Sequence, residues 1–191
     1  MIHIAIFASG TGSNARKIIN YFAAHPQIQV TLILTNNPSA LVTEVATQAG
    51  IPVSVFTREE FYQSGKVLET LQQHHIQWVI LAGFLWLVPH NLIQQYANRI
   101  INIHPALLPK FGGKGMYGMR VHQAVVENKE THTGITIHLV NEKYDEGEVL
   151  FQATCAVEPG DTAEEVAHKV QILEHMHFAE VIEKVILKNV Y

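Results

Sequence analysis

Two polar side chains near the middle of the chain have types and spacing that suit chemistry on a carbonyl group. Asn102 and His104 follow a short apolar segment, residues 99–103, that we expect to be a strand. Residues two apart in a strand point to the same face, so an amide and an imidazole are presented together. Pro105 and Pro109 then hold the exit rigid. An amide can donate to a developing oxyanion, and an imidazole can polarise a carbonyl or move a proton.

A carboxylate would complete this set, and Asp145 is the candidate. It lies in a polar segment, residues 141–147, between two apolar stretches, and this segment can return over the edge of the sheet that carries His104. Two alternatives stay open on the residues alone. Asp close to a glycine is a common hairpin signal, and a strand-end histidine can simply satisfy backbone groups.

The N-terminal loop suits the binding of a phosphate. An apolar, β-rich segment, residues 1–8, runs into a loop that contains Gly10 and Gly12, and a helical pattern follows. Such a loop gathers backbone N–H groups and a helix N-terminus around one point. Ser13 and Asn14 add side-chain donors. The sequence therefore favours a monophosphate site.

Two other nucleotide-binding motifs and a plain tight turn compete with this interpretation of the loop. Gly10-x-Gly12-x-x-Ala15 fits a dinucleotide fingerprint, but that site needs an acidic residue about 20 positions on to hold the ribose. Thr35-Asn36-Asn37-Pro38 stands there, without an acid. A Walker loop is excluded because no Gly-Lys-Ser/Thr follows, whereas a plain tight turn stays open.

The elements that must position these residues alternate along the first half of the chain. Alternating strands and helices predict an α/β fold with an open, twisted, mostly parallel sheet that binds ligands at the carboxyl ends of its strands. Two later strands predict an antiparallel extension, and a long C-terminal helix begins at a capping box of Asp161 and Glu164. The expected strands are 1–8, 29–34, 53–56, 78–82, 99–103, 133–140 and 148–157. The first expected helix follows the glycine loop and ends at residue 24, and the others span 41–49, 59–75, 89–97 and 162–187.

The composition limits the class of protein. The chain has 191 residues, of which 48% are hydrophobic, and it shows no internal repeat, so we expect a single domain, residues 1–191. Its formal charge is −4 and it has no basic stripe, which argues against a nucleic-acid partner. The longest uncharged apolar run, residues 78–88, is shorter than the roughly 20 residues needed to cross a bilayer. No basic residue precedes Arg16, so we expect a cytoplasmic protein without a signal peptide.

Metal and disulfide chemistry are not expected. A single cysteine, Cys155, cannot form an internal disulfide, and it lies in an apolar strand where we interpret it as a core residue. Twelve histidines invite a metal site. However, His74-His75 and His175-x-His177 lack the i, i+4 spacing of helical metal ligands.

One acidic residue of the C-terminal helix has an unusual position. Glu174 lies on the same side as Val170 and Val181, at the edge of the apolar stripe. A carboxylate there is costly unless it is exposed or paired, and the rim of a cleft meets that condition. An exposed glutamate beside the stripe is the alternative.

Five segments, taken in order, resemble the glycinamide ribonucleotide formyltransferases of purine biosynthesis, and the resemblance covers nearly the whole chain. Each segment alone is moderately specific, but five in order at this length are strongly so. They are Ser9-Gly10-Thr11-Gly12-Ser13-Asn14, Leu81-Ala82-Gly83-Phe84, Asn102-Ile103-His104-Pro105-Ala106-Leu107-Leu108-Pro109-Lys110, Asp145 before a glycine, and Gly160-Asp161-Thr162 leading to Glu174-His175.

The resemblance implies a Rossmann-like formyltransferase fold and an enzyme. Its reaction would move a formyl group from 10-formyltetrahydrofolate, a co-substrate, to the amine of 5′-phosphoribosylglycinamide, with no metal. By the same resemblance, the catalytic residues are Asn102, His104 and Asp145, the substrate-binding residues are Gly12, Ser13, Asn14 and Glu174, and the cofactor-binding residues are Arg58, Leu85, Trp86, Leu87, Val88, Asn102, Asn141 and Tyr144.

The chain departs from the family pattern in two places. Leu85-Trp86 stands where some relatives carry an arginine. Residues 111–118 are longer and richer in glycine than expected, which suggests either a mobile flap or a solvent-exposed loop. Lys114 within this segment could reach a phosphate.

Three other functions compete with this interpretation. Another folate-dependent formyltransferase, acting on methionyl-tRNA or an amino sugar, would share the Asn-x-His and Asp pattern. A non-catalytic phosphate- or nucleotide-binding module would keep the glycine loop but has no use for Asn102, His104 and Asp145 together. A nicotinamide oxidoreductase is disfavoured by the missing acid.

Overall fold

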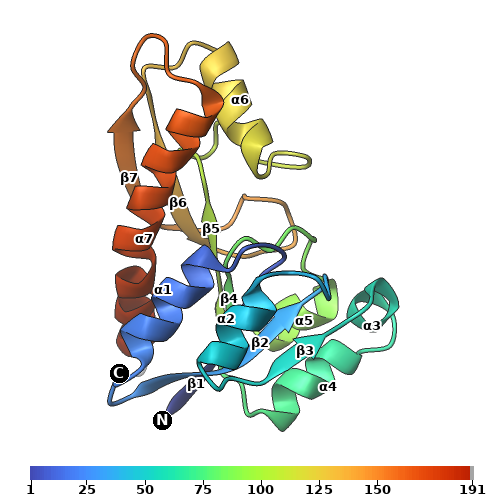
Figure 1. Ribbon diagram of the computed structural model, residues 1–191. Coiled ribbons are helices and arrows are strands. Elements are labelled where there is room, and N and C mark those ends of the chain that lie inside the picture. The colour runs from blue at the N-terminus through green and yellow to red at the C-terminus, as the bar shows by residue number, and fades with distance from the viewer. Residues whose placement is uncertain (190–191) are drawn as a thin grey trace.

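The computed structural model describes residues 1–189, whose seven strands form one sheet in the order β3-β2-β1-β4-β5-β6-β7 (Figure 1). The first five strands pair in parallel, and β6 and β7 pair antiparallel at one edge. The predicted fold class, with its antiparallel extension, is confirmed. The strands are β1 (Ile2–Phe7), β2 (Ile28–Thr35), β3 (Val53–Val55), β4 (Trp78–Leu81), β5 (Ile100–His104), β6 (His132–Leu139) and β7 (Val149–Ala156).

The strand order reverses between β1 and β4. From β1 the chain adds β2 and β3 on one side, and it then crosses back to add β4 and β5 on the other. At such a switch point the loops after neighbouring strands turn to opposite faces of the sheet and leave a crevice at the carboxyl ends. The glycine loop after β1 and His104 at the end of β5 both belong to this edge.

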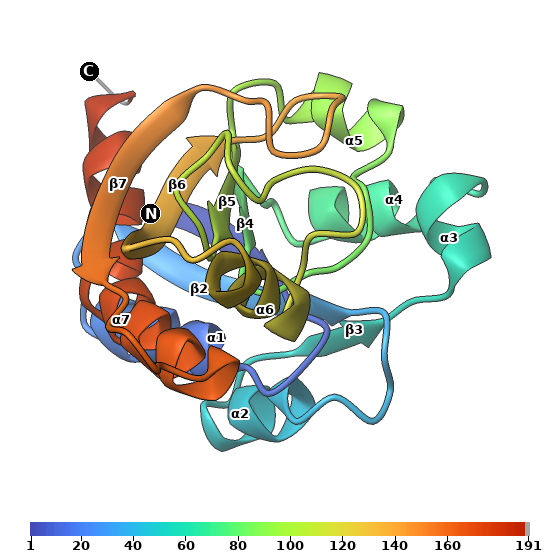
Figure 2. The ribbon, with the colours of Figure 1, turned by 90° about the horizontal axis from the view of Figure 1, so that it is seen from above.

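Helices cover both faces of the sheet (Figure 2). Side chains of β1 alternate between two cores: Ile4 and Ile6 pack on the side of α1, α2 and α7, whereas Ala5 and Phe7 pack on the side of α3, α4 and α5. This two-sided burial is typical of a parallel sheet with helical crossovers. The helices are α1 (Ser13–Phe22), α2 (Val42–Gln48), α3 (Arg58–Tyr62), α4 (Lys66–Gln73), α5 (His90–Gln95), α6 (Met119–Glu127) and α7 (Ala163–Lys188).

Three details of the helices differ from the sequence predictions. The helix expected over residues 59–75 is two short helices, α3 and α4, because Gly65 takes a left-handed conformation between them (φ 74°). The capping box of α7 uses Thr162 and Glu165, one residue later than predicted. Asp161 instead accepts from the N–H of Glu158 and pairs with Lys169.

Helix α6 was not predicted at all. It begins after Gly118, which offers no side-chain cap, and it follows a glycine-rich segment, so its start carries none of the usual sequence signals. It packs against α7 above the end of β5 (Figure 1).

An aromatic cluster supports the loop after β4. Phe7 contacts Phe84 with ring centroids 5.3 Å apart, and Phe61 stacks on Phe56 at 5.1 Å. Trp86 packs against this cluster, 6.0 Å from Phe56. Aromatic pairs at these separations attract each other in addition to the area they bury.

Two further points concern membrane crossing and the number of domains. Among residues 1–189, no helix combines the length and apolarity required for a membrane crossing. The predicted single domain extends to residues 190 and 191, outside the described range, and stays a prediction.

The glycine loop is fixed by a close contact with α2. Gly12 precedes α1 in a left-handed conformation (φ 73°), and a Cβ atom on it would lie 2.9 Å from atoms of Val42. The N–H of Val42 also donates to the carbonyl of Gly10. The left-handed backbone and the close approach of Val42 both favour a residue without a side chain at position 12.

We expect Gly12→Ala to lower the free energy of unfolding more than Gly50→Ala does. Gly50 is also left-handed (φ 67°), but a Cβ there has nothing within 4 Å, so its substitution costs only backbone strain of about 1–2 kcal/mol. Gly12→Ala adds overpacking against Val42, at a further cost of about 1–3 kcal/mol. Urea unfolding of the two variants measures the difference. Equal losses would show that the contact with Val42 is easily relieved.

Candidate active site

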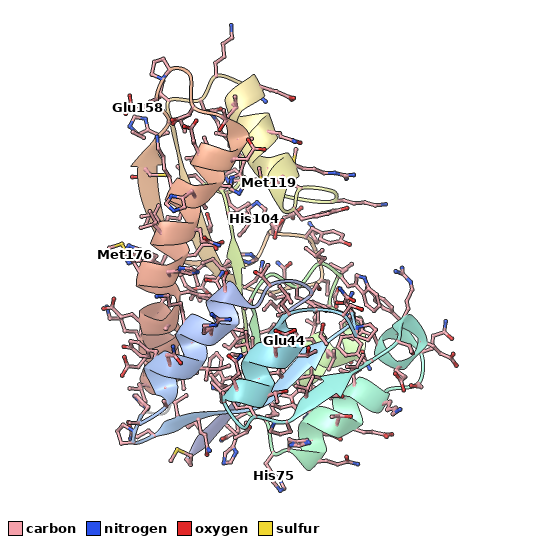
Figure 3. The ribbon with its side chains drawn as sticks, viewed as in Figure 1. Glu44, His75, His104, Met119, Glu158 and Met176 are labelled. Atoms are coloured by element: carbon pink, nitrogen blue, oxygen red, sulfur yellow. The ribbon has the colours of Figure 1, made fainter. Side chains whose placement is uncertain are left out.

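A cavity of about 820 Å³ opens at the carboxyl ends of β1, β4 and β5. Its floor is formed by the loops that follow these strands, and its walls by residues 113–118, α6, the loop between β6 and β7, and α7. In Figure 3, His104 lies near the start of α6, where Met119 is labelled. The position agrees with the switch point of the strand order.

The three predicted catalytic residues lie together on this floor. His104 Nδ1 is 3.5 Å from Asp145 Oδ2, and both side chains are largely buried. Asn102 joins the group through a histidine that the sequence analysis missed, His138, whose Nε2 lies 3.1 Å from Asn102 Nδ2. His138 Nε2 is also 3.6 Å from Asp145 Oδ1.

His138 sets the orientation of Asn102. Its Nδ1 lies 2.8 Å from the carbonyl oxygen of Leu139. A carbonyl only accepts and an amide nitrogen only donates, so Nδ1 donates to Leu139 and Nε2 accepts from the Asn102 amide. The second N–H of that amide is then available to the cavity. Asn102 and His138 are paired in the β5–β6 register, so this contact was hidden from any local pattern.

His104 is held between a carboxylate and a backbone carbonyl. Its Nε2 is 2.7 Å from the carbonyl oxygen of Phe111, so this nitrogen carries a proton. Burial lowers the pKa of His104 below its ordinary value, and the Asp145 carboxylate opposes this only in part. The imidazole is therefore mainly neutral at neutral pH.

Asp145 stays ionised despite its burial. Burial raises its pKa, but His138, His104 and the N–H of Gly113 together outweigh this effect, so the pKa lies below its ordinary value. Gly113 donates to Oδ2 at 2.9 Å. Asp145 itself is left-handed (φ 54°), so the same residue also performs the turn role that the sequence left open.

The glycine-rich segment of residues 111–118 is attached to the catalytic group at its start. The carbonyl of Phe111 accepts from His104, and the N–H of Gly113 donates to Asp145. Gly112 lies between them, where a Cβ would overlap Leu108 and lie 3.4 Å from Asp145 Cβ. Residues 113–118 form part of the cavity wall, Lys114 among them. In this conformation the segment occupies hydrogen-bonding positions on both His104 and Asp145.

The other end of the cavity is built for an anion and a polar ligand. Helix α1 begins at Ser13 without a side-chain cap, so its first N–H groups lack intrahelical partners. Asn14 Nδ2 donates to Glu174 Oε2 at 2.9 Å. Asn14 Oδ1 is buried and has no hydrogen-bond partner among residues 1–189. Gly12, Ser13, Asn14 and Glu174 all line the cavity.

Glu174 is half-buried at the junction of α1 and α7. Burial raises its pKa above the ordinary value, and the hydrogen bond from Asn14 opposes this only in part. The carboxylate is thus paired and lies on a cavity wall, as the position on the apolar stripe suggested.

The predicted cofactor residues divide into two groups. Leu85, Trp86, Leu87, Val88, Asn102 and Tyr144 line the cavity, and the apolar residues 85–88 form one wall of it. Arg58 and Asn141 do not line the cavity. The Arg58 guanidinium stacks 5.6 Å from the Trp86 ring. Asn141 accepts from the N–H of Lys143 and donates to the carbonyl of Glu146, so it shapes the loop that carries Tyr144 and Asp145.

Within residues 1–189, no group of three or more His, Cys, Asp or Glu side chains is arranged to hold a metal ion. The absence of a metal cofactor stays a prediction. Cys155 is half-buried and packs against the larger core, and burial raises the pKa of its thiol.

The fold is that of a known class of transferase. A family model described as formyl transferase matches residues 2–182, and the chain belongs to that family. The solved structure of phosphoribosylglycinamide formyltransferase from Bacillus halodurans superposes with a TM-score of 0.86 at 34% identity, covering 96% of this chain and 94% of that one.

Sequence relatives carry the same name. The phosphoribosylglycinamide formyltransferase of Bacillus subtilis is 31% identical over 99% of this chain and 97% of its own length. A chloroplastic protein of that name from Arabidopsis thaliana is 42% identical over 94% of this chain, and one from Vigna unguiculata is 41% identical. The aligned regions cover only 63% and 59% of these two plant proteins.

We expect Glu174→Gln to become more stable relative to the wild type as pH rises. The folded-state pKa of Glu174 is raised, so ionising this group opposes folding once the pH passes its unfolded value, and glutamine never ionises. The free energy of unfolding, measured in urea at pH 4, 6 and 8, reports the effect.

Glu183→Gln is a control in which we expect the opposite change of stability with pH. Hydrogen bonds from Tyr21 and His25 lower the pKa of Glu183, so its ionised form stabilises the fold above the unfolded value. This variant should lose stability relative to the wild type over the same pH range. The same trend in both variants would contradict the assigned environments.

Proposed function

We propose that the protein transfers the formyl group of 10-formyltetrahydrofolate to the amine of 5′-phosphoribosylglycinamide. The observation that carries the proposal is the convergence of Asn102, His104 and Asp145 on the floor of one cavity whose far end is a glycine loop suited to an anion. The names of the bacterial and plant relatives support the same reaction.

The acceptor is proposed to lie along the glycine loop and α7. Its phosphate would accept from the free N–H groups at the start of α1 and from Ser13 and Asn14. Asn14 Oδ1, which is buried without a partner among the described residues, needs a donor, and a polar ribotide can supply one. Glu174 would accept from the same ligand.

The formyl donor is proposed to lie against the apolar wall. Its flat ring system suits Leu85, Trp86, Leu87, Val88 and Tyr144. Arg58, stacked on Trp86, would reach only the outer end of such a molecule. Asn141 would act through the loop whose shape it sets.

The proposed chemistry is a direct transfer. The neutral amine forms a bond to the formyl carbon, and the formyl oxygen becomes an oxyanion that accepts from the free N–H of Asn102. As the tetrahedral intermediate collapses, the bond to the folate nitrogen breaks and a proton from the amine passes to that nitrogen. His104, 3.5 Å from Asp145, would carry this proton once the carbonyl of Phe111 leaves its Nε2.

The remaining predictions about the protein accompany this function. We propose the two small molecules as its partners, with no role for nucleic acid or membrane, and a cytoplasmic location. The two plant relatives are described as chloroplastic, so the location needs its own experiment.

We expect wild-type protein to release tetrahydrofolate from 10-formyltetrahydrofolate when phosphoribosylglycinamide is present. Asn102→Ala should lower kcat about 100- to 1,000-fold, because it removes a donor to the oxyanion. His104→Ala should lower kcat by a similar factor through loss of proton transfer. Steady-state rates measured spectrophotometrically test both.

His132→Ala serves as the control, because His132 is an exposed histidine on β6 outside the cavity. It should keep wild-type rates. No turnover by the wild type with this acceptor, but turnover with methionyl-tRNA or an amino sugar, would reassign the substrate. Unchanged rates in both cavity variants would reject the proposed mechanism.

A further inference from the structure

A third buried histidine lines the cavity, in addition to His104 and His138, and the proposed mechanism does not use it. His122 lies on α6, is only 6% exposed, and lines the same cavity as His104. Its Nδ1 is buried and has no hydrogen-bond partner among residues 1–189. Burying a polar atom without a partner costs free energy, and such atoms in native proteins usually have a reason.

Packing does not explain this residue. The neighbouring core positions of α6, Val121 and Val125, are fully buried and apolar. A leucine at position 122 could fill a similar volume without leaving a polar atom unpaired. The imidazole is therefore better explained by what it presents to the cavity than by the stability of α6.

The surroundings of the His122 ring determine its charge and which ring nitrogen carries the proton. Burial lowers the pKa of His122, and the nearby His104 lowers it further, so the ring is neutral at neutral pH. A neutral imidazole has one N–H and one lone pair. An unpaired N–H is rarer in protein interiors than an unpaired acceptor, which favours the lone pair at the enclosed Nδ1. The proton is then on Nε2, where it can be donated.

The position of α6 indicates which ligand this donor serves. Helix α6 packs on α7, whose Ala167, Val170 and Glu174 line the cavity between α6 and the glycine loop. The apolar wall of residues 85–88 comes from the loop after β4. His122 thus lies on the side of the cavity that is formed by α6 and by α7, which carries Glu174.

We propose that His122 binds the amine acceptor, by donating its Nε2–H to an oxygen of that molecule. This inference rests on the function proposed above and adds a binding residue on α6. The donor is uncharged, so it suits a carbonyl or hydroxyl oxygen, while the glycine loop supplies the groups for the phosphate.

Three substitutions test which ring nitrogen is used. His122→Leu removes both nitrogens, His122→Asn keeps an amide near the position of Nδ1, and His122→Gln places an amide N–H near the position of Nε2. We expect KM for phosphoribosylglycinamide to rise about tenfold or more in the leucine and asparagine variants and less than about threefold in the glutamine variant. KM for 10-formyltetrahydrofolate should stay at its wild-type value in all three.

A stability measurement separates binding from a structural role. We expect His122→Leu to unfold at a urea concentration equal to or above that of the wild type, because it removes an unpaired buried atom. Thr133→Val is the matched control, since Thr133 is 2% exposed, its Oγ1 has no partner among the described residues, and it lies outside the cavity wall. It should keep stability and both KM values.

The outcomes distinguish this inference from the proposed function. An inactive wild type would overturn the function itself. An active wild type with an unchanged acceptor KM in His122→Leu would overturn only the role of His122, as would a loss of stability that accompanies the loss of binding. A better acceptor KM in His122→Asn than in His122→Gln would overturn the assignment to Nε2. If the leucine variant does not fold, the comparison of asparagine with glutamine still decides.

Discussion

One buried carboxylate organises the site. Asp145 lies within 3.6 Å of His104 and His138 and accepts from the N–H of Gly113. Burial alone would raise its pKa, but the surrounding groups together hold that pKa below its ordinary value. The carboxylate in turn links the end of β5, the register of β6 and the glycine-rich segment. A shift in any one of them would leave a buried charge without partners.

Around this carboxylate, two parts of the cavity differ in how completely their polar groups are hydrogen-bonded. The catalytic floor is internally paired, since His138 bonds to Asn102 and His104 bonds to Phe111. The glycine-loop end is not, because Asn14 Oδ1 is buried without a partner among the described residues. Paired groups are preorganised for a reaction, whereas unpaired ones indicate where a ligand must supply the missing contacts. This asymmetry agrees with a small, polar acceptor at the glycine loop.

The errors of the sequence predictions have identifiable causes. The helix expected over residues 59–75 is interrupted because the apolar spacing continues across Gly65, whose backbone is left-handed. Helix α6 was missed because Gly118 provides no cap signal, and with it His122 was missed. Arg58 was assigned through the family resemblance and stays a prediction, and its guanidinium packs on Trp86 outside the cavity wall. In each case the local pattern was correctly observed, but the backbone or the tertiary contacts decided the outcome.

The sequence by itself determined the alternation of strands and helices, the glycine loop after β1, and the shared face of Asn102 and His104, because each depends on neighbours within a few residues. Only the tertiary structure decided that His138 meets Asn102, 36 residues away, and that Asp145 returns to His104. Those contacts depend on the register between β5 and β6 and on the path of the loop after β6. Register is selected by burial across the whole sheet, and no local periodicity encodes it.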